Sequence, residues 1–170
     1  MRPDVSRDYQ WQRAFLPEMK RIVGECLIGE APFEEDARRN TDLIVLRLEA
    51  VRVGCRVRRA IYLARYGHEF TIRQDRPSGA QSELEKIVAG WGDYLLYGFA
   101  DPNDQMLARW CLGSLHAFRG WYASELEHRA GQRPGTERQN HDGSSSFRAF
   151  RVADIPGFVT AQHDYRLAVA

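Results

Sequence analysis

The chain has 170 residues, with 24 lysines and arginines against 23 aspartates and glutamates, which gives a formal net charge of +1. This length fits one domain with a sizeable core, and a composition of 44% hydrophobic and 28% charged residues excludes wholesale disorder. No apolar run approaches the roughly 20 residues of a membrane helix, and the first residues lack the apolar segment of a signal peptide. We therefore expect a cytoplasmic protein without membrane contact.

The cysteines, histidines and glycines exclude several classes of site. Cys26, Cys55 and Cys111 are widely spaced and odd in number, and no CxxC or HExxH pattern occurs. A disulfide framework and a structural zinc site are therefore not expected, and a reducing compartment fits best. The five histidines show no ligand spacing, and there is neither a GxGxxG fingerprint nor a P-loop.

The near-neutral total charge hides an uneven distribution. Of the 24 basic residues 22 are arginine, and residues 38–76 hold 10 arginines against 4 acids, between two segments with an acidic excess. A GC-rich genome explains an overall excess of arginine but not its concentration in one segment. This basic block is compatible with an anionic partner in spite of the total of +1.

Hydrophobic periodicity predicts the elements of the first half of the chain. Residues 7–29 are expected to form one amphipathic helix or two, with Pro17 breaking or starting one of them. Residues 31–40 are expected to form a short helix that begins near a proline and three acids. The apolar run at 43–46 and the alternation at 51–58 predict two strands of a β-hairpin. A connector or short helix at 59–67 precedes a third strand at 68–73.

In the second half, Ser82 and Glu85 have the spacing of a capping box and predict a helix that ends near Gly90, followed by Trp91 in the core. Further elements are expected at 93–99 (strand), 107–115 (strand), 118–129 (helix) and 147–155 (strand). Residues 131–146, rich in Gly, Ser, Gln and Arg, predict a flexible loop. The expected organisation is an α/β core over 1–130, the loop 131–146, and a C-terminal strand and tail over 147–170 that packs on the core.

Several short motifs carry a resemblance to a known family. They are Thr41-Asp42, Arg56-Val57-Arg58-Arg59, Glu69-Phe70-Thr71-Ile72-Arg73, and the segments 78–87 and 90–94. Together with the order of helix, three strands, helix and strand, they resemble phage-type proteins of the PD-(D/E)XK, or restriction-endonuclease-like, superfamily over about residues 30–120. The resemblance implies a mixed central sheet flanked by helices, and a phage-derived protein in the cytoplasm of a bacterial host.

The resemblance also implies a site. In this family, two carboxylates on one face of the sheet hold Mg²⁺ and a lysine positions or activates the attacking water. Asp42 matches the metal-binding acid, Glu35 would support it from the preceding helix, and Glu83 and Lys86 would lie near the metal or the phosphate. With Arg58 at the lysine position, the implied catalytic set is Asp42, Arg58, Glu83 and Lys86, and the implied activity is Mg²⁺-dependent hydrolysis of phosphodiester bonds.

The (D/E)-x-K tripeptide of the family maps onto Arg56-Val57-Arg58, and there the sequence departs from the pattern. An arginine cannot act as a base at neutral pH, and Arg56 would repel Mg²⁺ where a carboxylate should bind it. Glu49 or Glu69 could replace the missing acid, although neither has the expected spacing. The departure favours an alternative, a catalytically inactive nuclease-fold protein.

The alternation at 51–58 places Arg52, Arg56 and Arg58 on one face of the strand. They form either the solvated outer face of an amphipathic strand or a phosphate-binding strip, which Arg59, Arg65 and Arg73 would extend. The sequence thus predicts a nuclease-like protein that acts on nucleic acid, with DNA favoured over RNA. The alternatives are an inactive protein that binds nucleic acid or a protein partner through these arginines, and an assembly protein that binds an acidic surface.

Overall fold

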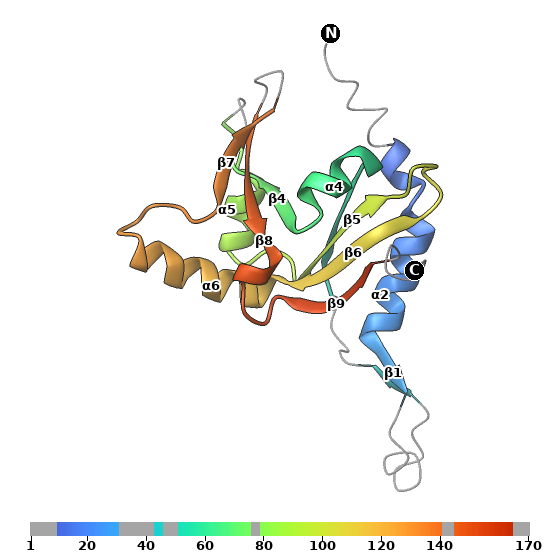
Figure 1. Ribbon diagram of the computed structural model, residues 1–170. Helices are drawn as coiled ribbons and strands as arrows, with labels where there is room; N and C mark the ends of the chain where they lie inside the picture. Colours follow the sequence, from blue (N-terminus) through green and yellow to red (C-terminus); the bar gives the residue numbers. More distant parts are fainter. Residues whose placement is uncertain (1–9, 31–42, 46–50, 76–78, 141–144, 165–170) are drawn as a thin grey trace, which may run out of the picture.

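The computed structural model describes residues 10–30, 43–45, 51–75, 79–140 and 145–164 (Figure 1). Its helices are α2 (Leu16–Leu27), α4 (Leu63–Tyr66), α5 (Glu83–Val88) and α6 (Leu115–His128), with 3-10 turns η1 (Ala60–Tyr62) and η2 (Val152–Asp154). Its strands are β1 (Ile28–Glu30), β2 (Leu43–Val45), β3 (Val53–Arg58), β4 (Glu69–Arg73), β5 (Tyr94–Ala100), β6 (Leu107–Ser114), β7 (Thr136–Gln139), β8 (Ser146–Arg151) and β9 (Val159–Asp164). None of the described helices is long and apolar enough to cross a bilayer.

The central sheet is mixed and has the strand order β3-β5-β6-β9. Strand β3 runs parallel to β5, whereas β5–β6 and β6–β9 are antiparallel pairs. A second, antiparallel sheet has the order β4-β8-β7, and β1 pairs with β2 in a separate two-stranded ribbon. A mixed α/β fold with a mixed central sheet and flanking helices is thereby confirmed.

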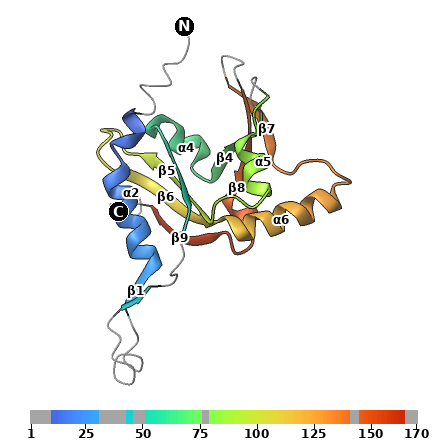
Figure 2. The same cartoon turned by 180° about the vertical axis from the view of Figure 1, so that it is seen from behind.

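One face of the central sheet is covered by α2. Buried Met19 and Ile22 of this helix, with Phe15 just before it, pack against Val57 and Leu96 of the sheet. Alternate residues of a strand point to opposite faces, so β3 presents its valines to α2 and its arginines to the other side. Figure 2 shows α2 and the β4-β8-β7 layer on opposite sides of the central sheet.

The other face of the central sheet carries an aromatic core shared with the second sheet, α5 and α6. Phe70 of β4 stacks on Phe158 with ring centroids 4.6 Å apart, and its ring lies edge-on to Phe118 of α6 and to Tyr97 of β5. Burial of these large rings supplies much of the hydrophobic driving force of this layer. The core therefore holds β4 over the arginine-bearing face of β3.

Several predicted elements are confirmed. The Ser82 hydroxyl accepts a hydrogen bond from the Glu85 amide at 3.2 Å, and the Ser82 amide donates to the Glu85 carboxylate at 2.6 Å, so the capping box starts α5 as expected. Residues 14 and 15 form a turn between a short helical stretch and α2, where Pro17 predicted a break. Helix α6 begins three residues before the predicted start, because Ser114 caps it.

Three predictions are wrong. The predicted hairpin of 43–46 with 51–58 does not form, because β2 pairs with β1 and β3 pairs in parallel with β5. Strand β5 is apolar and buried, so it can have a neighbouring strand on each side within the sheet. The segment 131–146, predicted as a loop, contains β7, an edge strand that pairs with β8.

Trp91, predicted in the core, is 66% exposed, because Gly90 and Gly92 on either side both take positive φ angles and turn it outward. The helix predicted at 31–40 lies outside the described residues.

Candidate functional site

Three of the predicted arginines meet at one small pocket. Arg56 and Arg58 of β3 and Arg73 of β4 line a cavity of about 170 Å³, which we call the arginine pocket. Its other lining residues are Thr71 of β4, Asn140 and Ser145 at the two ends of the β7–β8 connection, and Phe147 of β8. Two strands that belong to different sheets thus contribute arginines to the lining of one pocket.

Arg56 is held in place by two partners. Its Nη1 donates to the Thr71 carbonyl at 3.1 Å, and its Nη2 donates to Glu83 Oε2 at 2.6 Å. The same carboxylate oxygen accepts from the Arg73 backbone N–H at 3.2 Å. Both side chains of the Arg56–Glu83 pair are 30% exposed. The guanidinium of Arg56 is therefore oriented by the fold, and Glu83 compensates part of the positive charge of the pocket.

Arg58 connects the arginine pocket to a group of tyrosines. Its guanidinium carbon lies 4.5 Å from the ring centroid of Tyr62 and 5.8 Å from that of Tyr66. Arg65 and Arg138 also stack on the Tyr66 ring, at 5.3 and 4.7 Å. We call these five residues the Arg–Tyr cluster. Cation–π contacts of this kind fix the arginines over aromatic faces while leaving their N–H groups available for hydrogen bonds.

A buried carboxylate anchors this cluster to β4. Glu69 is only 6% exposed, and its two oxygens lie 2.8 and 3.0 Å from the Nη atoms of Arg138. A buried charge of this kind is stable only when it is paired, and Arg138 supplies that pairing with one hydrogen bond, from Nη2 to Oε2, while Oε1 has the ion-pair contact but accepts no hydrogen bond from the described residues. Glu69 of β4 and Arg138 of β7 therefore form an ion pair across the β4-β8-β7 sheet.

Most of the remaining predicted residues lie outside the arginine pocket and the Arg–Tyr cluster. Arg52 is exposed just before the opposite end of β3, where its backbone N–H donates to Asp93 Oδ2 at 2.8 Å. Arg59 stacks on Trp11, 4.6 Å from the ring, and Lys86 is exposed on α5. Arg65 is the exception, because it stacks on Tyr66 and so belongs to the Arg–Tyr cluster. Asp42, Glu35 and Glu49 fall outside the described residues.

The described residues by themselves do not fit a magnesium ion. No group of three or more His, Cys, Asp or Glu side chains within the described ranges could hold a metal. Glu83 is the carboxylate that contacts the pocket arginines, and its Oε2 already accepts from Arg56 and from the Arg73 amide. Mg²⁺ requires several oxygen ligands and is repelled by a guanidinium. A metal site would therefore depend on the predicted ligands Asp42 and Glu35.

Sequence reasoning missed several residues of this site. Tyr62 and Tyr66 have i, i+4 spacing in a segment predicted as a connector or short helix, and this spacing could have indicated a shared face. Asn140, Ser145 and Arg138 gave no such signal, because their segment showed no periodicity. Their positions follow from the pairing of β7 with β8, which is a long-range property.

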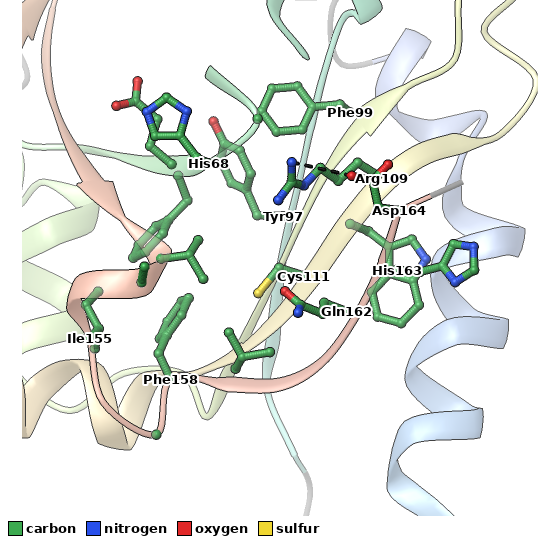
Figure 3. Close-up of a pocket in the computed structure, with 18 residues that line it drawn as sticks. His68, Tyr97, Phe99, Arg109, Cys111, Ile155, Phe158, Gln162, His163 and Asp164 are labelled. Carbon is green, nitrogen blue, oxygen red and sulfur yellow. Dashed lines mark ion pairs between the residues drawn. The ribbon is translucent and has the colours of Figure 1, made fainter. Parts of the chain in front are cut away.

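A second cavity, of about 690 Å³, lies between the central sheet and the start of β4 (Figure 3). Aromatic residues of both layers line it, together with Arg109, Cys111, Gln162 and Asp164. Burial raises the pKa of the Cys111 thiol to about 11, so this thiol is protonated and unreactive at neutral pH. The lining residues come from segments far apart in the sequence, which is why no motif predicted this cavity.

Comparison of the chain with protein-family models, with curated proteins and with solved structures finds no match. The assignment to the PD-(D/E)XK superfamily thus stays a prediction that rests on the short motifs. Functional inference for this chain accordingly depends on the geometry of the arginine pocket and the Arg–Tyr cluster.

Proposed function

We propose that the protein binds nucleic acid, with DNA favoured over RNA, through the arginine pocket and the adjoining Arg–Tyr cluster. The observation that carries this proposal is the convergence of Arg56, Arg58 and Arg73 on one pocket. Guanidinium groups match the oxygens of a phosphate with paired N–H donors, and Asn140 and Ser145, which are hydrogen-bonded to each other, add neutral polar groups to the lining. A backbone phosphate is the ligand that this chemistry favours.

Preorganisation supports the same proposal. Arg56 is fixed by Thr71 and Glu83, and Arg58 is fixed by the ring of Tyr62. A long side chain that is already ordered loses less conformational entropy when it binds a ligand. Surface arginines that only provide solubility do not need such contacts, so the solvated-face interpretation is less well supported for Arg56 and Arg58.

The Arg–Tyr cluster adds apolar contacts beside the pocket. Tyr62 is 37% exposed, and its neighbour Ile61 is 77% exposed. Aromatic faces next to a basic groove stack on nucleobases, a contact worth about 1–3 kcal/mol per base. Because Arg58 belongs both to the pocket and to the cluster, a phosphate in the pocket would leave its base within reach of these side chains.

Binding without cleavage is the activity that the described contacts favour. Arg56 stands where the family pattern requires a carboxylate, and it neutralises Glu83 rather than leaving it to a metal. Mg²⁺-dependent cleavage remains the competing proposal and depends on Asp42. A plasmid incubated with Mg²⁺ or Mn²⁺ separates the two, since cleavage that is lost in Asp42→Ala would establish the nuclease.

The binding proposal is tested by the double substitution Arg56→Ala and Arg58→Ala. We expect affinity for a fluorescently labelled oligonucleotide to fall at least tenfold in an anisotropy titration. The slope of log K against log salt should also become shallower by about 2, because two phosphate contacts are lost.

The matched control replaces two exposed arginines outside the site, Arg21→Ala on α2 and Arg129→Ala just after α6. Both are in i, i+4 ion pairs with glutamates, so the control removes the same charge without touching the pocket. Equal loss in both variants would mean non-specific attraction to the net charge. If the unaltered protein does not bind an oligonucleotide at low salt, the proposal fails and a protein partner becomes the better explanation.

A further inference from the structure

The second cavity has one apolar side and one charged side, and it shares no lining residue with the arginine pocket (Figure 3). The apolar side is formed by Phe70 of β4, by Ile155 and Phe158 of the segment before β9, and by Tyr97 of β5. Phe70 and Phe158 stack with an interplanar angle of 10°. Phe158 also covers Gly113, where a Cβ atom would lie 2.1 Å from its ring. These aromatic walls are therefore packed in fixed positions.

The charged side is an ion pair between neighbouring strands. Arg109 of β6 and Asp164 of β9 are paired in register, and Arg109 Nη1 lies 3.5 Å from Asp164 Oδ2. Both remain partly accessible, with 38% and 28% of their side chains exposed. The Arg109 guanidinium lies close to Gly67, where a Cβ atom would be 3.4 Å from Nη1.

The charges of the lining decide which ligands suit the cavity. Arg109 and Asp164 present one positive and one negative group side by side, and the Glu69 carboxylate at the wall is neutralised by Arg138. A simple anion would meet Asp164, and a simple cation would meet Arg109. A ligand that carries a positive and a negative group close together can contact both groups at once.

We propose that this cavity binds a small zwitterion with an aromatic body, an aromatic α-amino acid. Its carboxylate accepts hydrogen bonds from Arg109, and its ammonium group donates to Asp164. Its ring packs among the aromatic walls, which bury apolar surface and offer stacked and edge-on contacts. A cavity of about 690 Å³ holds such a molecule together with ordered water.

The test is isothermal titration calorimetry of the full chain with L-tryptophan and two analogues of the same indole body. Tryptamine carries only the ammonium group, and indole-3-propionate carries only the carboxylate. We expect L-tryptophan to bind at least tenfold more tightly than either analogue. Equal affinity for all three, or no heat of binding with L-tryptophan and L-phenylalanine up to about 1 mM, would overturn the proposal.

Two substitutions assign the charges to the residues. Arg109→Gln should abolish the preference for L-tryptophan over tryptamine, and Asp164→Asn should abolish the preference over indole-3-propionate. Arg129→Gln and Glu127→Gln, at the end of α6 and away from the cavity lining, are the matched controls and should change neither ratio. Preferences that persist in both cavity variants would contradict the assignment, and the analogue series on the unaltered protein stands even if a variant fails to fold.

Discussion

Glu83 is the residue at which the two proposed activities make opposite demands. A nuclease would use its carboxylate near the metal or the phosphate, whereas a binding pocket is weakened by a negative charge among its arginines. In the structure this carboxylate accepts from Arg56 Nη2 at 2.6 Å and from the Arg73 amide at 3.2 Å. It therefore lowers the positive potential that a phosphate would meet.

We predict that Glu83→Gln strengthens oligonucleotide binding severalfold. The amide keeps an oxygen that can accept from Arg56, but it removes the negative charge beside the pocket. Anisotropy titrations at several salt concentrations measure the change, which should be largest at low salt. Loss of the ion pair should lower the free energy of unfolding by about 1 kcal/mol or less, because both groups are partly solvated.

The matched control for this substitution is Glu125→Gln on α6, where the carboxylate pairs with Arg129 away from the pocket. It should leave the affinity almost unchanged. Weaker binding in Glu83→Gln, with a folded protein by circular dichroism, would contradict a purely compensating role for Glu83. Loss of metal-dependent cleavage in this variant would favour the nuclease instead.

At the scale of the elements, the sequence predicted those whose signals are local. The capping box at Ser82 and the alternation of Val53, Cys55 and Val57 with arginines both reappear in the structure. The wrong predictions concern pairing: β3 pairs with β5, and β7 pairs with β8. Strand pairing depends on which apolar faces meet across the chain, and short-range patterns do not contain that information.

The residues of the candidate site also fall into two groups: those whose placement follows from local patterns and those whose placement depends on strand pairing. That Arg56 and Arg58 share one face followed from the period of a strand. That Arg73 joins them, and that Glu83 lies against Arg56, depends on β4 lying over β3, which no local pattern predicted. The place of Asn140 at the pocket depends on β7, in a segment whose composition predicted a loop.

The entry into β7 offers a test of this edge strand. Gly135 has a φ of +84°, and a Cβ atom there would lie 2.8 Å from the Ala149 carbonyl oxygen and from the Phe150 ring. We predict that Gly135→Ala lowers the free energy of unfolding by about 2–4 kcal/mol, from the strained backbone together with the overlap. Urea denaturation followed by circular dichroism measures it.

Gly131→Ala is the control for the backbone strain alone. Gly131 has nearly the same φ, +85°, but a Cβ atom there would meet no other atom within 4 Å. Its substitution should cost only about 1–2 kcal/mol. If both variants lose the same free energy of unfolding, the close contact of Gly135 with β8 does not constrain β7. The strand would then be packed less tightly against β8 than the structure indicates.

For the whole molecule, the aromatic core joins the two sheets into one unit. Phe70 is 1% exposed and contacts Phe158, Phe150 and Phe118 with centroid separations of 4.6, 5.5 and 5.9 Å. Its partners belong to β8, to α6 and to the segment before β9. The positions of the arginine pocket and of the second cavity both depend on this core, because each is lined by residues of β4 together with residues of the central sheet.

We therefore predict that Phe70→Leu shifts the unfolding of the entire described structure in one transition. The change of shape and volume should lower the free energy of unfolding by about 1–3 kcal/mol, whereas Val88→Ala at an exposed position of α5 should change it by about 0.5 kcal/mol or less. Tryptophan fluorescence reports on both layers, because Trp11 and Trp110 lie on the α2 side and Trp121 packs against the aromatic core, and it should give the same single midpoint in urea as far-ultraviolet circular dichroism. Two fluorescence transitions, or different midpoints for the two signals, would mean that the α2 layer unfolds separately. In that case the arginine face of β3 would keep its own fold but lose the partners that β4 provides, and oligonucleotide affinity should fall at urea concentrations where part of the tryptophan signal is still native.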